Sequence, residues 1–102
     1  MSDFAETQVE PGVRRQVLAD HPDLMVVAFR FNEGAEGNLH RHPHVQATYV
    51  KAGRFRLSLS GESVEVGPGD SFVIPSGTEH GCVCLQAGEL IDCFTPRRDD
   101  FL

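Results

Sequence analysis

The chain has 102 residues and a formal net charge of −6, from 15 acidic and 9 basic residues. This length corresponds to one domain with its own core, which we expect to span residues 1–102, and the acidic excess argues against binding of nucleic acid. Neither a signal-peptide pattern nor an apolar run of membrane-spanning length is present, so we expect a cytoplasmic protein that does not bind membranes.

Apolar residues alternate with period two in much of the chain, while glycine and proline recur too often for a long helix. The first predicted strand covers residues 25–31. Its alternating apolar side chains are Met25, Val27, Phe29 and Phe31. After a predicted turn over residues 51–54, a second strand carries Phe55, Leu57 and Leu59 on one face. This alternation indicates strands that are buried on one face only.

The second half of the chain contains more short strands between turn signals. Gly61-Glu62 is predicted to close a hairpin between the second strand and Val64 to Val66. The further strands are predicted over residues 71–74, 80–85 and 90–95, separated by turns at 67–70, 75–77 and 86–88. Regular short strands of this kind predict an all-β sandwich or small barrel.

Two glycine-punctuated strings carry the residues most able to bind a metal. The first string contains Gly34, His40, His42, Gln46 and Gly53, and the second contains Gly69, Pro75, Gly77 and His80. We expect His40, His42 and Gln46 to share one face of a strand by their even parity, with His80 as the fourth ligand. Three imidazoles and an amide oxygen suit a divalent ion, with Ni, Zn, Mn, Fe and Co all possible.

Both strings have the spacing of the two cupin motifs, and the chain resembles the cupin superfamily over residues 34 to 80. Gln46 stands where most cupins have glutamate, and Cys84 stands where asparagine often ends the second motif. The resemblance implies a single small β-barrel, the double-stranded β-helix or jelly roll, with the metal inside the barrel mouth. A neutral amide at Gln46 would leave the full charge of the divalent ion on the site.

The stretches 40–46 and 80–99 are similar to the KdgF subfamily of pectin-degradation cupins, in which glutamine belongs to the metal set. This resemblance implies a metal-dependent enzyme that converts 4,5-unsaturated uronates, released by pectin or alginate lyases, into linear 5-keto-4-deoxyuronate. It also implies that Asp92, Phe94 and Arg98 are functional residues.

The side-chain chemistry of these three residues agrees with such roles. Asp92 and Phe94 share parity on the last predicted strand, so both can face the metal. Asp92 is the candidate general acid/base, with a pKa that burial raises and a nearby cation lowers. Phe94 would form an apolar wall, and Arg98 would clamp a carboxylate. The alternatives are a turn residue, a core aromatic and a solvated surface charge. His44 is left as a candidate for supporting a ligand or contacting substrate.

Three cysteines, an odd number, fit a reducing compartment. We interpret Cys82, Cys84 and Cys93 as small buried hydrophobic residues. Cys82 and Cys84 share strand parity with His80, so a place near the metal is an alternative, although an isolated Cys-x-Cys pair is a weak metal signal.

Two other functions fit the same histidines. A cupin dioxygenase would hold iron and consume oxygen, and a non-catalytic module would bind or sense a sugar acid without turnover. By analogy with cupins we expect a homodimer, with the segment from Val9 to Leu18 as a possible edge strand. The expected ligand is a small sugar acid.

Overall fold

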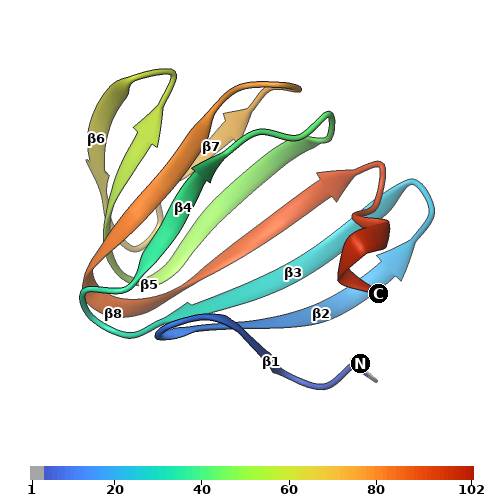
Figure 1. The fold of residues 1–102 in the computed structure, drawn as a ribbon, viewed down its shortest axis with the longest axis horizontal. Coiled ribbons are helices and arrows are strands. Elements are labelled where there is room, and N and C mark those ends of the chain that lie inside the picture. Colours follow the sequence, from blue (N-terminus) through green and yellow to red (C-terminus); the bar gives the residue numbers. More distant parts are fainter. Residues whose placement is uncertain (1–3) are drawn as a thin grey trace.

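The computed structural model describes residues 4–102, and these residues fold almost entirely into β-strands (Figure 1). The strands are β1 (Thr7–Glu10), β2 (Val13–His21), β3 (Leu24–Phe31), β4 (Glu36–His40), β5 (Val45–Leu59), β6 (Glu62–Val66), β7 (Ser71–Ile74) and β8 (His80–Thr95), followed by the 3-10 turn η1 (Asp99–Phe101). The all-β prediction is therefore confirmed. In the part of the chain that the structure describes, no helix is long and apolar enough to cross a membrane.

The long strands β5 and β8 pair with each other along most of their length and take part in two layers. The second half of β8 pairs with β3 and with the first half of β5, and β2 and β1 extend this layer beyond β3. The first half of β8 pairs with β4, while the second half of β5 pairs with β6. Figure 1 shows the two layers diverging from the end where β5 and β8 bend, which leaves the opposite end open.

Glycines occupy the bend where β5 and β8 pass between the layers. Gly53 has a φ of +83°, and a Cβ there would lie 2.5 Å from the carbonyl oxygen of Gln86. Gly88 lies across from it, where a Cβ would overlap the carbonyl oxygen of Ala52. The predicted turns at residues 51–54 and 86–88 are therefore wrong as strand ends. They are irregularities inside continuous strands, where glycine permits sharp bending and close backbone approach.

Replacing Gly88 with alanine is expected to destabilise the fold by about 3 kcal/mol, because the added methyl group has no room against the Ala52 carbonyl. Urea denaturation would measure this change. Gly61→Ala is the matched control, since Gly61 has a φ of +81° but open space around it. That variant should lose only the left-handed backbone preference, about 1 kcal/mol. Equal losses in the two variants would contradict the steric explanation.

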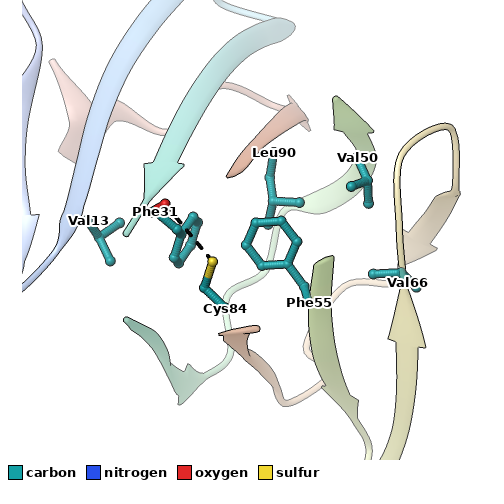
Figure 2. Packing of buried hydrophobic residues seen from close by; sticks show 7 residues of the cluster. All are labelled: Val13, Phe31, Val50, Phe55, Val66, Cys84 and Leu90. Carbon is teal, nitrogen blue, oxygen red and sulfur yellow. Dashed lines mark hydrogen bonds between the residues drawn. The ribbon is translucent and has the colours of Figure 1, made fainter. Parts of the chain in front are cut away.

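The core forms where the inward faces of the two layers meet. Figure 2 shows its main cluster, in which Phe31 from β3 packs edge-on against Phe55 from β5 at a centroid distance of 5.1 Å. The other buried members of this cluster are Val13, Val50, Val66, Cys84 and Leu90. A second cluster, of Val17, Met25, Val27 and Phe94, lies toward the open end. The alternation predicted for residues 25–31 thus identifies a strand that contributes to both clusters.

The remaining predicted elements agree with the structure at the level of the strands. The hairpin prediction is confirmed, since β5 and β6 pair in register with Leu59 opposite Glu62. Residues 71–74 form β7, and the two strands predicted over residues 80–85 and 90–95 are parts of the single strand β8. Strand β4 has no counterpart in the prediction, because residues 36–40 carry no apolar alternation.

Candidate metal centre and adjoining cavity

Three histidines from different parts of the chain converge at the open end. His40 ends β4, His42 lies in the connection to β5, and His80 begins β8 directly opposite His40. One ring nitrogen from each lies within 4.8 Å of the others. The prediction that His40, His42 and Gln46 share a single strand face is wrong, since β4 ends at His40 and β5 begins only at Val45. The turn between these strands brings the histidines together.

Each of the three imidazoles is oriented by a backbone carbonyl. The Nδ1 atom of His40 lies 2.7 Å from the carbonyl oxygen of Asn38. The Nδ1 atom of His42 lies 3.1 Å from the carbonyl oxygen of His44. The Nδ1 atom of His80 lies 2.9 Å from the carbonyl oxygen of Thr78. A neutral imidazole that donates from Nδ1 keeps an unshared electron pair on Nε2, the arrangement found in metal-ligating histidines. Nε2 of His80 is buried without a hydrogen-bond partner. These features fit a bound cation.

The surroundings also keep the histidines neutral. Burial lowers the pKa of His80 to about 4, against a weaker opposing effect from the Thr78 carbonyl. Burial and then the positive charge of Arg98 lower the pKa of His42. Since only the neutral imidazole binds a metal, these two side chains are in the coordinating form at neutral pH.

A chain of hydrogen bonds links the histidines to Asp92. Gln46, Thr48 and Asp92 face the interior, and Thr48 lies opposite Asp92 in the pairing of β5 with β8. The Thr48 hydroxyl donates to Oδ1 of Asp92 over 2.6 Å, so it can only accept from Nε2 of Gln46, at 3.0 Å. Oε1 of Gln46 consequently faces Nε2 of His42 at 3.1 Å. Neither of these two acceptor atoms can donate a hydrogen bond to the other, whereas a cation bound by both would explain their short distance.

Asp92 is an acidic group with a strongly raised pKa. Burial raises the pKa of Asp92 to about 7, although hydrogen bonds from Thr48 and Gln46 and the charge of Arg98 act in the opposite direction. The side chain is 6% exposed. The predicted rise in the pKa of Asp92 is confirmed, and the carboxyl group can exchange a proton near neutral pH.

The raised pKa of Asp92 predicts a pH-dependent stability in protein freed of metal by a chelator. The folded state holds the Asp92 proton up to about pH 7, whereas the unfolded state loses it near the ordinary value of 3.8. The destabilising effect therefore grows as pH rises between these values, to at most about 4 kcal/mol. Asp92→Asn removes this effect, so the variant should exceed the wild type by about 2–4 kcal/mol at pH 8 and match it near pH 4.

Urea denaturation of the two chelated proteins at pH 4, 6 and 8 would measure this difference. His42 and His80, whose lowered pKa values make stability fall on acidification below about pH 6.5, are present in both proteins. Their effect cancels in the comparison. A constant difference across the pH range would show that Asp92 does not titrate as described.

A cavity of about 370 Å³ joins these groups. Six of the seven predicted site residues line it: His40, Gln46, His80, Asp92, Phe94 and Arg98. Thr48 also belongs to the lining. The seventh, His42, contacts the ring of Phe94 at a centroid distance of 5.7 Å. The Arg98 guanidinium lies 5.3 Å from the Phe94 ring centroid and forms a two-point ion pair with Asp100.

Among the other residues that line the cavity, Thr48, Arg15 and Phe101 can contact a ligand there but were not predicted from the sequence. Thr48 could have been found from its parity, which places it between Gln46 and Val50 on the inward face of β5. Arg15 alternates with the buried Val13 and Val17, which is the corresponding signal in β2. Phe101 gives no such signal, because it lies in the short η1 turn.

His44 and the cysteines take supporting positions. The carbonyl of His44 orients His42, and the His44 ring lies 6.4 Å from that of Phe94.

Cys84 is buried in the main core cluster, and Cys82 and Cys93 are partly buried. Burial raises the pKa of Cys82 to about 12, which disfavours the thiolate that a metal ligand would require. The interpretation of the cysteines as small hydrophobic residues agrees with this environment.

The family assignment follows from the sequence that forms this fold and cavity. The sequence pattern of the cupin domain matches residues 27–92, from β3 through the histidines to Asp92. The chain belongs to the cupin family. The described strands agree with the predicted cupin barrel, and solved cupin structures are similar to this chain over nearly its full length.

Individual relatives of this cupin are also similar over nearly its full length. It is 40% identical over 93 residues to the pectin degradation protein KdgF of Dickeya dadantii, covering 89% of this chain and 84% of the relative. The structure of KdgF from Halomonas sp. matches with a TM-score of 0.92 and 46% identity, covering 96% and 91% of the two chains. An RmlC-like cupin from Shewanella frigidimarina matches with a TM-score of 0.93 and 39% identity, covering 98% and 90%. This cupin is therefore a close homologue of KdgF.

Proposed function

We propose that this cupin is a metal-dependent enzyme that opens the ring of 4,5-unsaturated uronates and yields linear 5-keto-4-deoxyuronate. The observation that carries the proposal is the placement of a protonatable Asp92 in one cavity with a histidine cluster and cationic side chains. Similarity to the pectin degradation protein KdgF of Dickeya dadantii supports the substrate class. The alginate-derived sugar would present the same unsaturated carbons and is included.

The reaction moves one proton and breaks one carbon–oxygen bond. The anomeric hydroxyl loses its proton and becomes the aldehyde, the ring oxygen departs from the anomeric carbon as an enolate, and the adjacent alkene carbon is protonated to leave a ketone. A divalent ion held by His40, His42, Gln46 and His80 would supply Lewis-acid stabilisation of negative charge on oxygen. The products contain the same atoms as the substrate, so the reaction is an isomerisation.

Asp92 can carry the proton between the two positions. An ionised carboxylate accepts the proton of the anomeric hydroxyl, and the resulting carboxylic acid delivers it to the alkene carbon. The group returns to its starting state, which a pKa near 7 favours because both forms are accessible at neutral pH. Thr48 holds Oδ1 of Asp92, which leaves Oδ2 to exchange the proton.

Phe94 and Arg98 would position the sugar acid. Phe94 is 1% exposed and contributes an apolar wall beside Asp92 on the same strand face. Arg98 is ordered against this ring and bound to Asp100, so its remaining N–H groups have a fixed direction. A planar guanidinium can donate to a carboxylate in a defined geometry, which would orient the ring over Asp92.

The ultraviolet absorption of the substrate's conjugated alkene provides the test. Metal-loaded protein should accelerate the loss of this band over the spontaneous rate, and a chelator should abolish the acceleration. A rate equal to the spontaneous one would overturn the proposal. Two accompanying measurements identify the alternatives: oxygen uptake at an electrode would indicate a dioxygenase, and tight calorimetric binding without turnover would indicate a binding or sensor module.

A further inference from the structure

Arg15 occupies an inward position in the wall of the cavity. It lies on β2 between Val13 and Val17, each 3% exposed, and opposite Phe29 of β3. Its side chain is partly buried and lines the same cavity as Asp92. Inward positions of a strand normally carry apolar residues, because burying a charge without a partner is unfavourable. An arginine at this position requires an explanation.

Arg15 forms no ion pair in the part of the chain that the structure describes, and the carboxylate whose charge acts on it, Asp100, is paired with Arg98. Neighbouring cations differ in this respect: Arg14 pairs with Glu6, and Arg98 pairs with Asp100 at 2.8 Å. Among the described residues, none forms a side-chain hydrogen bond with the Arg15 guanidinium. Its N–H donors therefore remain available to a ligand in the cavity.

Phe101 brings Arg15 and Arg98 together. The Phe101 ring centroid lies 4.1 Å from the guanidinium carbon of Arg15 and 4.3 Å from that of Arg98. The ring is itself fixed by edge contacts to Phe29 and Phe94, at centroid distances of 6.0 and 5.7 Å. Figure 1 shows η1, which carries Phe101, beside the ends of β2 and β3. Stacking holds the two guanidiniums in place despite their like charge.

Two cations against one ring in a cavity wall favour an anion between or beside them. Asp100 offsets one of the two positive charges, which leaves about one net charge for the ligand. Glu10 also lines the cavity, but its carboxylate does not form an ion pair with Arg15. A carboxylate is the matching ligand group, because its two oxygens can accept parallel N–H donors from a guanidinium.

We propose that Arg15 binds the carboxylate of the sugar-acid substrate, in a subsite that it shares with Arg98 and that Phe101 organises. The identity of the sugar acid rests on the proposed function, whereas the subsite depends only on the contacts above. Arg15 would therefore distinguish a uronate from a neutral sugar. Arg98, which is held in place by its ion pair with Asp100, would contribute further N–H donors to the same carboxylate.

The test compares Arg15→Gln with Arg14→Gln, which removes the same charge from the adjacent outward position. Arg15→Gln should raise KM for the unsaturated uronate about 10- to 100-fold, the effect of losing charged hydrogen bonds, with kcat changed less than about threefold. Arg14→Gln should leave both constants unchanged. Arg15→Lys retains the charge without the planar fork and should give an intermediate KM, which also shows that the loss is not one of folding.

Calorimetry on the metal-loaded protein separates the subsite from the proposed reaction. Glucuronate, a saturated hexuronate, should bind about 10- to 100-fold more weakly to Arg15→Gln, while its neutral amide should bind both proteins equally. If the wild type lacks turnover but glucuronate shows this loss, the subsite stands and the proposed function fails. If the wild type turns over and Arg15→Gln keeps its KM and its glucuronate affinity, the subsite proposal is overturned.

Discussion

Asp92→Asn is expected to lower kcat for ring opening of the unsaturated uronate by about 10²- to 10⁴-fold while leaving the bound metal in place. The amide is nearly isosteric with the acid and can still accept the hydrogen bond from Thr48. It cannot exchange a proton near neutral pH. The loss should therefore appear in kcat rather than in KM, because the variant removes a group needed in the transition state and preserves the cavity.

Glu10→Gln is the matched control for this variant, since Glu10 is the other acidic residue that the described part of the chain contributes to the cavity lining. Its kcat should stay within about threefold of the wild type, given that no hydrogen bond links Glu10 to the chain that runs from His42 to Asp92. Metal content is measured by elemental analysis of both proteins. Retained activity in Asp92→Asn, or loss of its metal together with activity, would contradict the role of Asp92 in proton transfer.

The pH profile of the wild type provides a second view of Asp92. A group that must be ionised to accept the first proton makes kcat/KM fall as the pH drops below its pKa in the free enzyme. Burial places that pKa well above the ordinary value of 3.8. The positive charge of a bound ion would lower this pKa again, so the acidic limb of the profile should lie between pH 3.8 and about pH 7.

Local alternation predicted those strands that have one buried face and one wet face, and it missed β4, which has no buried face. The period-two pattern from Met25 to Phe31 identified β3 correctly. It could not distinguish a bend from a turn: Gly53 has a positive φ, which suits either, and only the pairing of β5 with β8 on both sides shows that the strand continues. The pairing likewise shows that β8 continues through Gly88.

The motif spacing identified the histidines of the candidate metal centre correctly, although the expected explanation of how they come together was wrong. The fixed offsets identified His40, His42 and His80, although the turn between β4 and β5 rather than strand parity brings the first two together. The cationic end of the cavity depends on contacts between distant segments. Arg15 and Phe101 meet across almost the whole chain, and no local pattern around Phe101 indicates its position.

The second large effect is expected at His80, where alanine should weaken binding of a divalent ion by about 100-fold or more. Removal of a residue that only orients a ligand typically lowers affinity 10- to 100-fold, and His80 would be a ligand itself. Its Nε2 is buried and unpartnered, and its Nδ1 is held by the Thr78 carbonyl, so the side chain has no other evident task. Isothermal calorimetry with Ni²⁺ or Zn²⁺ would measure the affinity.

Thermal or chemical unfolding supplies an independent measurement of the same loss. At a metal concentration of 100 times the wild-type Kd, a bound ion stabilises the folded protein by about 2.7 kcal/mol. His80→Ala, with a Kd raised 100-fold, should gain only about 0.4 kcal/mol under the same conditions. His21→Ala is the control, because His21 lies at the exposed end of β2 near Asp23 and should keep the full gain. Equal metal-dependent gains in the two variants would exclude His80 from the site, and with it the histidine cluster as the metal centre on which the proposed chemistry depends.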